Sequence, residues 1–304
     1  MEKTTKHTIS IGGGKGGIGK SFISVNLGAE LANNDRRVIL IDLDLGCANL
    51  HSFLLTELPQ VSICDFLNGR KNSISETLIK TGIPNLSLIS GYQDALDISN
   101  LKYYQKLKLL KAINQLEADY IVLDLGPGTS FNMLDFFLFA DFQIVVAMPE
   151  QTSVENTYRF FQSCLLRRLK AKIQDKKLFQ MVQVAMDPKN REGLRKSVDL
   201  YRWLKKFDPG LAEKVKAEII NWEIHLVVNG LKKESDKEIG KAIQRIGSVY
   251  FGAHIAHLGN IEYDEHVWQS IRTSRPLVQE YSHTKSAASL RKIARLILNH
   301  LEPH

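Results

Sequence analysis

Short apolar runs recur along the chain, several of them ending in a polar residue, and their lengths match those of buried β-strands. These runs occupy residues 8–11, 37–44, 86–90, 120–124, 142–148, 225–229 and 248–258. Strands that are covered on both faces of a parallel sheet carry such a continuous apolar pattern instead of an alternating one. The pattern therefore predicts an α/β fold, a three-layer sandwich with a mostly parallel central sheet.

Segments with the apolar spacing of helices lie between or after several of these runs. One begins at Phe22, one covers 101–116 with apolar residues at 101, 107, 110, 113 and 116, and one covers 286–301. Short helices are expected within 56–83. The last helical segment is expected to pack on the sheet, while its basic residues leave a membrane-surface helix as the alternative.

The segment 165–222 differs from the rest of the chain in composition. It holds 15 Lys and Arg against 7 Asp and Glu, so it carries the whole of the chain's net charge of +7. We expect a single domain over 1–304 with a mainly helical basic insertion at 165–222. A basic surface of this kind binds nucleic acid, anionic lipid or an acidic partner, or is simply a solvated face.

A glycine-rich motif lies between the first apolar run and the first helical segment. The sequence GKGGIGKS fits G-x-x-x-x-G-K-[ST], the loop whose backbone N–H groups surround nucleotide phosphates. Lys20 would reach the terminal phosphates and Ser21 would supply an oxygen to Mg²⁺. The expected nucleotide-binding residues here are Gly14, Lys15, Gly16, Gly17, Ile18, Gly19, Lys20, Ser21 and Phe22.

The glycines of this motif also fit two other functions. Gly12, Gly14 and Gly17 also match the dinucleotide-binding fingerprint, but that motif predicts no use for the Lys-Ser pair after Gly19. A purely structural glycine turn is the second alternative. The complete eight-residue match between a strand and a helix favours phosphate binding over both.

Aspartates follow two of the predicted strands. Ligands of open α/β sheets gather outside the carboxyl ends of the strands, which places Asp42, Asp44 and Asp124 near the glycine-rich loop. An aspartate after four apolar residues is typical of phosphate-loop nucleotide hydrolases, so Asp124 is expected to hold Mg²⁺ together with Ser21. For Asp44, a plain cap of the following turn is the alternative to a catalytic role.

Several of these residues go beyond the generic motif and resemble a known family. KGGIGKS, with Lys15, resembles the loop of the MinD/ParA family of deviant Walker A P-loop ATPases, and DLDLGCANL at 42–50 is similar to its MinD/FlhG-like branch. The resemblance implies three catalytic residues. Lys15 would reach the phosphates of a nucleotide held by the partner subunit, Lys20 those of its own nucleotide, and Asp44 would position the attacking water.

The same resemblance adds four nucleotide contacts. By this resemblance, Asn49 lies in the family's first nucleotide-sensing loop, called switch I. Glu150 and Thr152 match a turn that faces the nucleotide and the dimer interface. Asn229 matches an asparagine that contacts the adenine base in relatives. From the residues alone, Thr152 fits a helix cap and Asn229 a turn equally well. The loop at 259–264 resembles the family's closing nucleotide-side loop but lacks its usual proline.

The resemblance implies an ATPase with ATP and Mg²⁺ as ligands and weak basal activity. It would be a dimerisation switch of the MinD/FlhG type, forming an ATP-dependent homodimer and controlling the placement or number of a cellular structure through a protein partner. A ParA-like nucleic-acid-binding partition ATPase is the first alternative. An Mrp-type iron-sulfur carrier is the second, although Cys47, Cys64 and Cys164 provide no CxxC pair for a cluster.

The cysteines and the hydropathy of the chain indicate the cellular compartment in which the protein is expected. The three cysteines are widely spaced, and no apolar run reaches the roughly 18 residues of a membrane span. The first residues lack an apolar leader. A cytoplasmic location is expected, with peripheral binding at the inner membrane surface, or binding to nucleic acid, left open.

Overall fold

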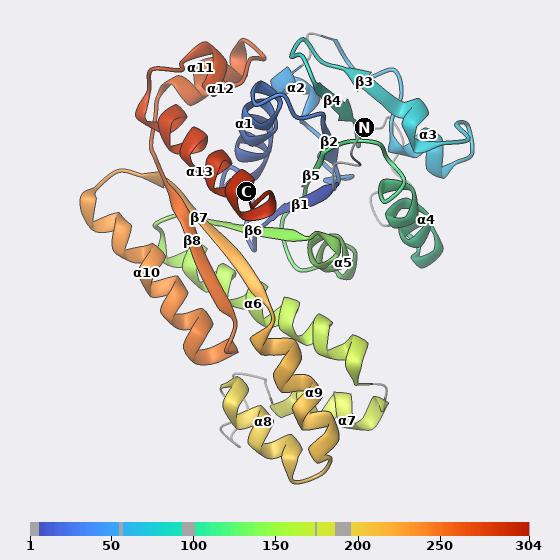
Figure 1. Cartoon of the computed structure of the whole chain (residues 1–304), viewed down its shortest axis with the longest axis vertical. Helices are drawn as coiled ribbons and strands as arrows, with labels where there is room; N and C mark the ends of the chain where they lie inside the picture. The colour runs from blue at the N-terminus through green and yellow to red at the C-terminus, as the bar shows by residue number, and fades with distance from the viewer. Residues whose placement is uncertain (1–5, 55–56, 93–100, 174, 186–195, 304) are drawn as a thin grey trace.

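The computed structural model describes residues 6–54, 57–92, 101–173, 175–185 and 196–303, and within them the strands form one sheet (Figure 1). The sheet has eight strands in the order β3-β4-β2-β5-β1-β6-β7-β8. Neighbouring strands are parallel except β3, which runs antiparallel to β4. The predicted mostly parallel sheet is confirmed. The strands are β1 (His7–Gly12), β2 (Val38–Asp42), β3 (Leu78–Lys80), β4 (Leu86–Ile89), β5 (Tyr120–Asp124), β6 (Phe142–Ala147), β7 (Glu223–Leu231) and β8 (His254–Glu262).

Helices cover both faces of the sheet, because successive strand residues point to opposite sides. Ile39 and Ile41 of β2 enter one hydrophobic core, whereas Val38 and Leu40 enter the other. Two layers of helices therefore enclose the sheet, as predicted. One layer contains α1 (Lys20–Asn33), α2 (His51–Leu54), α11 (His266–Arg272), α12 (Leu277–Glu280) and α13 (Lys285–Leu301), and the other contains α3 (Ile63–Leu67), α4 (Tyr103–Ile113), α5 (Phe131–Phe139), α6 (Gln151–Lys172) and α10 (Lys237–Ile246).

Three further helices lie beyond the sheet, at the lower end of Figure 1, where α6 leads into them. They are α7 (Lys176–Ala185), α8 (Ser197–Lys205) and α9 (Pro209–Ile220). Asp208 caps α9 by accepting the Leu211 N–H at 2.9 Å, and Pro209 occupies the first turn, where no N–H is needed. α6 passes through the predicted first residue of the insertion without a break, and the Asp-Pro pair at 187–188 lies outside the described residues.

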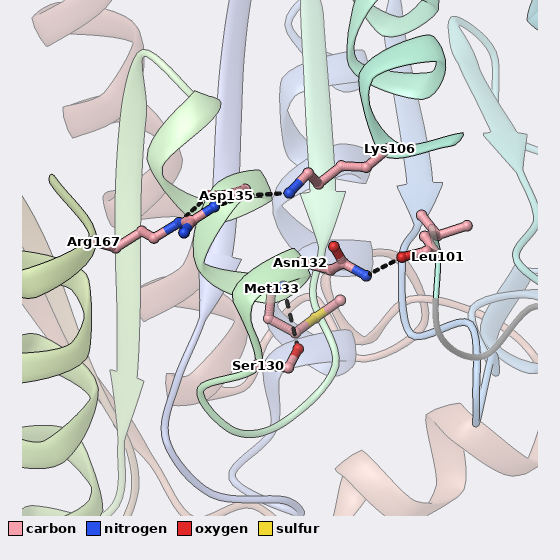
Figure 2. A network of polar contacts seen from close by, with 7 residues as sticks. All are labelled: Leu101, Lys106, Ser130, Asn132, Met133, Asp135 and Arg167. Atoms are coloured by element: carbon pink, nitrogen blue, oxygen red, sulfur yellow. Dashed lines mark hydrogen bonds and ion pairs between the residues drawn. The ribbon is translucent and has the colours of Figure 1, made fainter. Parts of the chain in front are cut away.

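Three charged side chains join α4, α5 and α6 (Figure 2). Asp135 of α5 accepts hydrogen bonds from Nε and Nη2 of Arg167 at 2.6 and 2.7 Å and pairs with the Lys106 ammonium on its other side. The next residue of α6, Arg168, pairs with Glu218 of α9 at 2.6 Å. Arg167 and Arg168 therefore contribute ion pairs within the fold and do not form a free basic patch.

The apolar face predicted for the helix within 101–116 is confirmed at Leu101, Ile113 and Leu116 but wrong at Leu107. Leu107 is 47% exposed, whereas Lys106 is only 4% exposed. The Lys106 ammonium is satisfied by Asp135 and lies 5.2 Å from the centre of the Tyr103 ring. Pairing with Asp135 therefore accounts for a lysine in the interior beside the apolar face of α4.

The prediction for the last strand is also wrong at its start. It was expected at 248–258, but residues 247–251 form a π-helical turn that extends α10, and β8 begins at His254. Phe251 packs into the core against Tyr158, with ring centres 5.0 Å apart, and Gly252 ends the turn with φ of +64°. Phe251 therefore lies on the buried side of a helical turn, whereas Val249 is exposed. Residues 259–262 of the expected closing loop belong to β8.

Candidate nucleotide site

The glycine-rich loop joins the carboxyl end of β1 to the first turn of α1. Gly19, the N-cap of α1, has φ of +91°, which side chains strongly disfavour. A Cβ atom there would also lie 2.2 Å from Nδ2 of Asn229. That amide donates to the Ile18 carbonyl at 3.0 Å, so β7 holds the loop in place. The predicted adenine contact of Asn229 stays a prediction.

The two lysines of the loop lie in different surroundings. Lys20 is 7% exposed, and its ammonium donates to the Lys15 carbonyl at 3.3 Å. Burial lowers the pKa of Lys20, while the charges of Asp124 and Asp44 act in the opposite direction. The Lys15 ammonium instead points to the start of α6, where it donates to Glu150 at 2.8 Å and to Thr152 at 3.1 Å.

Asp124 lies at the end of β5, directly beneath Ser21. Its two oxygens accept hydrogen bonds from the hydroxyls of Ser21 at 2.7 Å and Ser24 at 2.8 Å. Burial raises the pKa of Asp124, and the two hydroxyls and Lys20 offset only part of this effect. Carboxylate and hydroxyl oxygens are the donors that Mg²⁺ prefers, so this pair fits the ion. Ser24 was not predicted, since it lies on the helix beyond the motif.

Asp42 is fully buried beside Asp124 and organises the loop that follows β2. Its carboxylate accepts the N–H groups of Asp44, Asn49 and Leu50 at 3.1, 2.9 and 3.0 Å. Burial and the neighbouring Asp124 charge raise the pKa of Asp42. Asp42 therefore has a positioning role, because it fixes the backbone that presents Asp44 and Asn49 to the loop.

A cavity of about 540 Å³ opens above the glycine-rich loop, a size that suits a nucleotide. Nine predicted residues line it, namely Gly16, Gly17, Gly19, Lys20, Ser21, Phe22, Asp44, Asn49 and Asn229. Much of the remaining wall is apolar. Glu262, Tyr263 and Asp264 come from the expected nucleotide-side loop at 259–264. The other lining residues were not among the predicted site residues, and they are Phe53, Pro127, Met148, Gly230, Val267, Trp268 and Ile271.

Six predicted residues do not line this cavity. Ile18 is buried under the loop and Asp124 under Ser21. The other four follow the side of the loop that faces α6, where a Cβ on Gly14 would meet the Asn156 carbonyl at 2.2 Å. This second group consists of Gly14, Lys15, Glu150 and Thr152.

A glycine-rich loop between the first strand and first helix of a parallel sheet, with a buried aspartate at the end of the adjacent strand, defines a phosphate-loop nucleotide-binding protein. Residues 6–176 match the family model described as an AAA domain. The chain belongs to this family and, within it, to the MinD/ParA group of P-loop ATPases with its FlhG-like branch.

Two curated relatives illustrate the placement. The antiactivator FleN of Pseudomonas aeruginosa is 23% identical over 290 residues, which cover 95% of this chain and 85% of FleN. The septum site-determining protein MinD of Helicobacter pylori is 30% identical over 154 residues, covering 50% of this chain and 56% of MinD. The chain thus matches FleN over most of its length and MinD over about half.

Solved structures share the fold. The cell division ATPase MinD of Pyrococcus furiosus superimposes with a TM-score of 0.64 at 20% identity, covering 97% of this chain and all of that one. A ParA family ATPase from Chlorobium tepidum gives 0.65 at 16% identity, with coverages of 96% and 99%. MinD of Pyrococcus horikoshii, solved with Mg-ADP, gives 0.62 at 18% identity, with 96% of both chains covered. Among the helices described for this chain, none has the length and apolar character needed to cross a membrane.

Proposed function

We propose that this protein is an ATP-binding and ATP-hydrolysing dimerisation switch of the MinD/FlhG type. ATP would hold two copies together, and the dimer would bind a protein partner and so control the placement or number of a cellular structure. The family membership supports the nucleotide chemistry. The regulatory outcome rests on the likeness to FleN, named an antiactivator, and to MinD, named a septum site-determining protein.

The observation that carries the proposal is the position of Lys15. Its side chain is 35% exposed and paired with the half-exposed Glu150, so the ammonium lies on the outer side of the loop. Lys20, by contrast, is buried under the nucleotide cavity. One loop therefore presents one cation inward and a second outward. This outward position of Lys15 supports the proposal that it contacts a phosphate held by a second subunit.

The remaining residues divide the chemistry among them. Lys20 and the N–H groups of the loop would stabilise the phosphate charge, and Asp44 would position the attacking water. Ser21 and Asp124 would hold Mg²⁺, which neutralises phosphate charge when it is bound. The apolar wall at Val267 and Trp268 suits a flat base, while the backbone loop binds the phosphates.

The decisive experiment compares the two lysines as alanine variants. Lys20→Ala should lose ATP binding in calorimetry, because it removes the buried cation of the cradle. Lys15→Ala should bind ATP close to normally but stay monomeric in light scattering with MgATP. Asp44→Ala should bind ATP, hydrolyse it slowly and accumulate as a dimer.

Concentration dependence gives a second measurement on the wild-type chain. If each site is completed by the second copy, ATP turnover per mole of protein should rise with protein concentration until the dimer saturates. Turnover that is independent of concentration, together with a monomeric Asp44→Ala variant in saturating MgATP, would contradict the dimer proposal. Family membership would stand in that case.

Partner binding is tested with two exposed lysines that form no ion pair among the described residues. Lys205 and Lys206 are exposed and lie at the end of α8, whereas Arg167 and Arg168 pair within the fold. The double change Lys205→Glu and Lys206→Glu should weaken capture of a protein partner and leave ATP turnover nearly intact. A salt-dependent DNA shift that requires ATP and is lost in the same variant would favour the ParA-like alternative instead.

A further inference from the structure

Three side chains with metal-binding atoms meet where β7 begins, at the end of the strand opposite the nucleotide cavity. Glu223 and His225 lie at the start of β7, and His300 lies in the last turn of α13. One carboxylate oxygen and one imidazole nitrogen from each histidine all lie within 4.8 Å of one another. The far end of β7, at Asn229, is the end that reaches the nucleotide cavity, so the two sites are separate.

His225 is the fixed member of this group. It is 4% exposed, and its ring stacks on Phe142 with ring centres 3.6 Å apart. Among the described residues its buried Nδ1 has no hydrogen-bond partner, and its Nε2 lies 3.8 Å from Oε1 of Glu223. Of the two ring nitrogens, Nε2 is therefore the one that faces Glu223.

The carboxylate of the group is oriented by a further histidine. Nδ1 of His254, on β8, lies 3.1 Å from Oε1 of Glu223, within hydrogen-bonding distance. Metal-binding carboxylates in proteins are commonly held in this way by an outer hydrogen bond. His254 thus belongs to the surroundings of the group without being one of its three members.

We propose that Glu223, His225 and His300 form a binding site for a divalent transition metal, with Zn²⁺ as the preferred ion. Two imidazoles and one carboxylate are a ligand set that Zn²⁺ accepts, with a water in the fourth position. Tetrahedral zinc at about 2.0–2.1 Å from nitrogen needs donor atoms roughly 3.3 Å apart. Glu223 and His300 are exposed and His225 is buried, so the two exposed ligands would move inward to reach that spacing.

Metal binding here would have a structural effect. His300 lies near the end of α13, and the other two ligands lie on β7, so an ion would fasten the end of that helix to the sheet. The site is built without any residue of the nucleotide cavity. The proposal therefore stands or falls independently of the proposed ATPase switch.

The test uses the full chain without a purification tag and without nucleotide. Titration with ZnCl₂ in a calorimeter should show one saturable site, and Co²⁺ should give the visible absorption of a low-coordinate complex. Zn²⁺ should raise the melting temperature, and EDTA should reverse the rise. His300→Asn and Glu223→Gln should each weaken Zn²⁺ binding by about tenfold or more.

Two controls separate this site from general surface binding. His283→Asn removes an exposed histidine outside the group and should leave the Zn²⁺ affinity unchanged. ATP binding should be unchanged in His300→Asn, which also shows that the variant is folded. Equal Zn²⁺ affinity in wild type, His300→Asn and Glu223→Gln, or the absence of saturable binding, would overturn the proposal.

Discussion

Two buried carboxylates, Asp42 and Asp124, are direct neighbours in the pairing of β2 with β5. Burial raises the pKa of both. The folded protein therefore holds protons that the unfolded chain releases above about pH 4, so this contribution to stability is complete at low pH and is lost as the pH rises. We expect the melting temperature of the nucleotide-free protein to fall between about pH 5 and about pH 8, measured by differential scanning calorimetry.

Asp124→Asn separates stability from ligand binding at the same residue. The amide removes a buried charge and still reaches the hydroxyls of Ser21 and Ser24, so the nucleotide-free melting temperature at about pH 8 should rise. The stabilisation by MgATP should disappear, because an oxygen ligand of the ion is lost. Asp44→Asn, at a less buried carboxylate, is the matched control and should leave the nucleotide-free melting temperature nearly unchanged. A lower nucleotide-free melting temperature in Asp124→Asn would contradict the argument.

For single residues, the sequence predicts those whose spacing is fixed by a motif. Lys20, Ser21 and Asp124 meet as expected, because each stands a set distance from a strand end. Val267 and Trp268 could not be predicted as cavity residues, since only the packing of the sheet and its helices brings them to a loop near the other end of the chain.

Among the helices, the ion pairs of Asp135 hold α4, α5 and α6 together (Figure 2). Its side chain is 18% exposed and that of Lys106 only 5%, so Asp135→Ala would leave a cation buried without a partner. Such a loss costs about 3 kcal/mol of unfolding free energy. Urea denaturation checks this, with Glu238→Ala as control, because its exposed pair with Lys241 is worth about 0.5 kcal/mol or less.

The pH dependence of that network has the opposite sign to that of the nucleotide site. Although burial acts to raise the pKa of Asp135, hydrogen bonds from Arg167 and Lys106 prevail and lower it. Its contribution is therefore present above the ordinary carboxyl pKa of about 4 and is lost as the pH falls further. The Asp135→Ala variant should lose this acid-side dependence, while the wild type retains it.

Element prediction failed where a tertiary partner overrode the local pattern. Apolar spacing favoured Leu107 as buried, but Leu107 is exposed and the neighbouring Lys106 is buried, where it pairs with Asp135. The short β3 was not predicted, because three residues that alternate in exposure give too little pattern to recognise. The long buried strands were predicted well, since their apolar runs follow directly from burial on both faces.

Over the whole molecule, α13 closes one face of the sheet. Ile293 is 1% exposed and belongs to the core that α13 shares with α1, whereas Leu296, one turn on, is 38% exposed. Ile293→Ala should cost about 2–5 kcal/mol of unfolding free energy, and Leu296→Ala about 0.5 kcal/mol or less. Chemical denaturation of the two variants side by side measures both values. Similar small costs would show that the helix is held loosely, as a detachable membrane helix would be.

The 22-residue helix α6 has the proportions of a lever. It begins one residue after Glu150, the partner of Lys15, and ends among the helices beyond the sheet. At 1.5 Å per residue it is about 33 Å long, so a tilt of about 5° at its start would displace its far end by about 3 Å. If Lys15 left Glu150 to contact a phosphate, the first turn of α6 would lose this ion pair and the helix would tilt there. Distances between spin labels on α1 and α9, measured with and without MgATP, would report the displacement of the far end of α6.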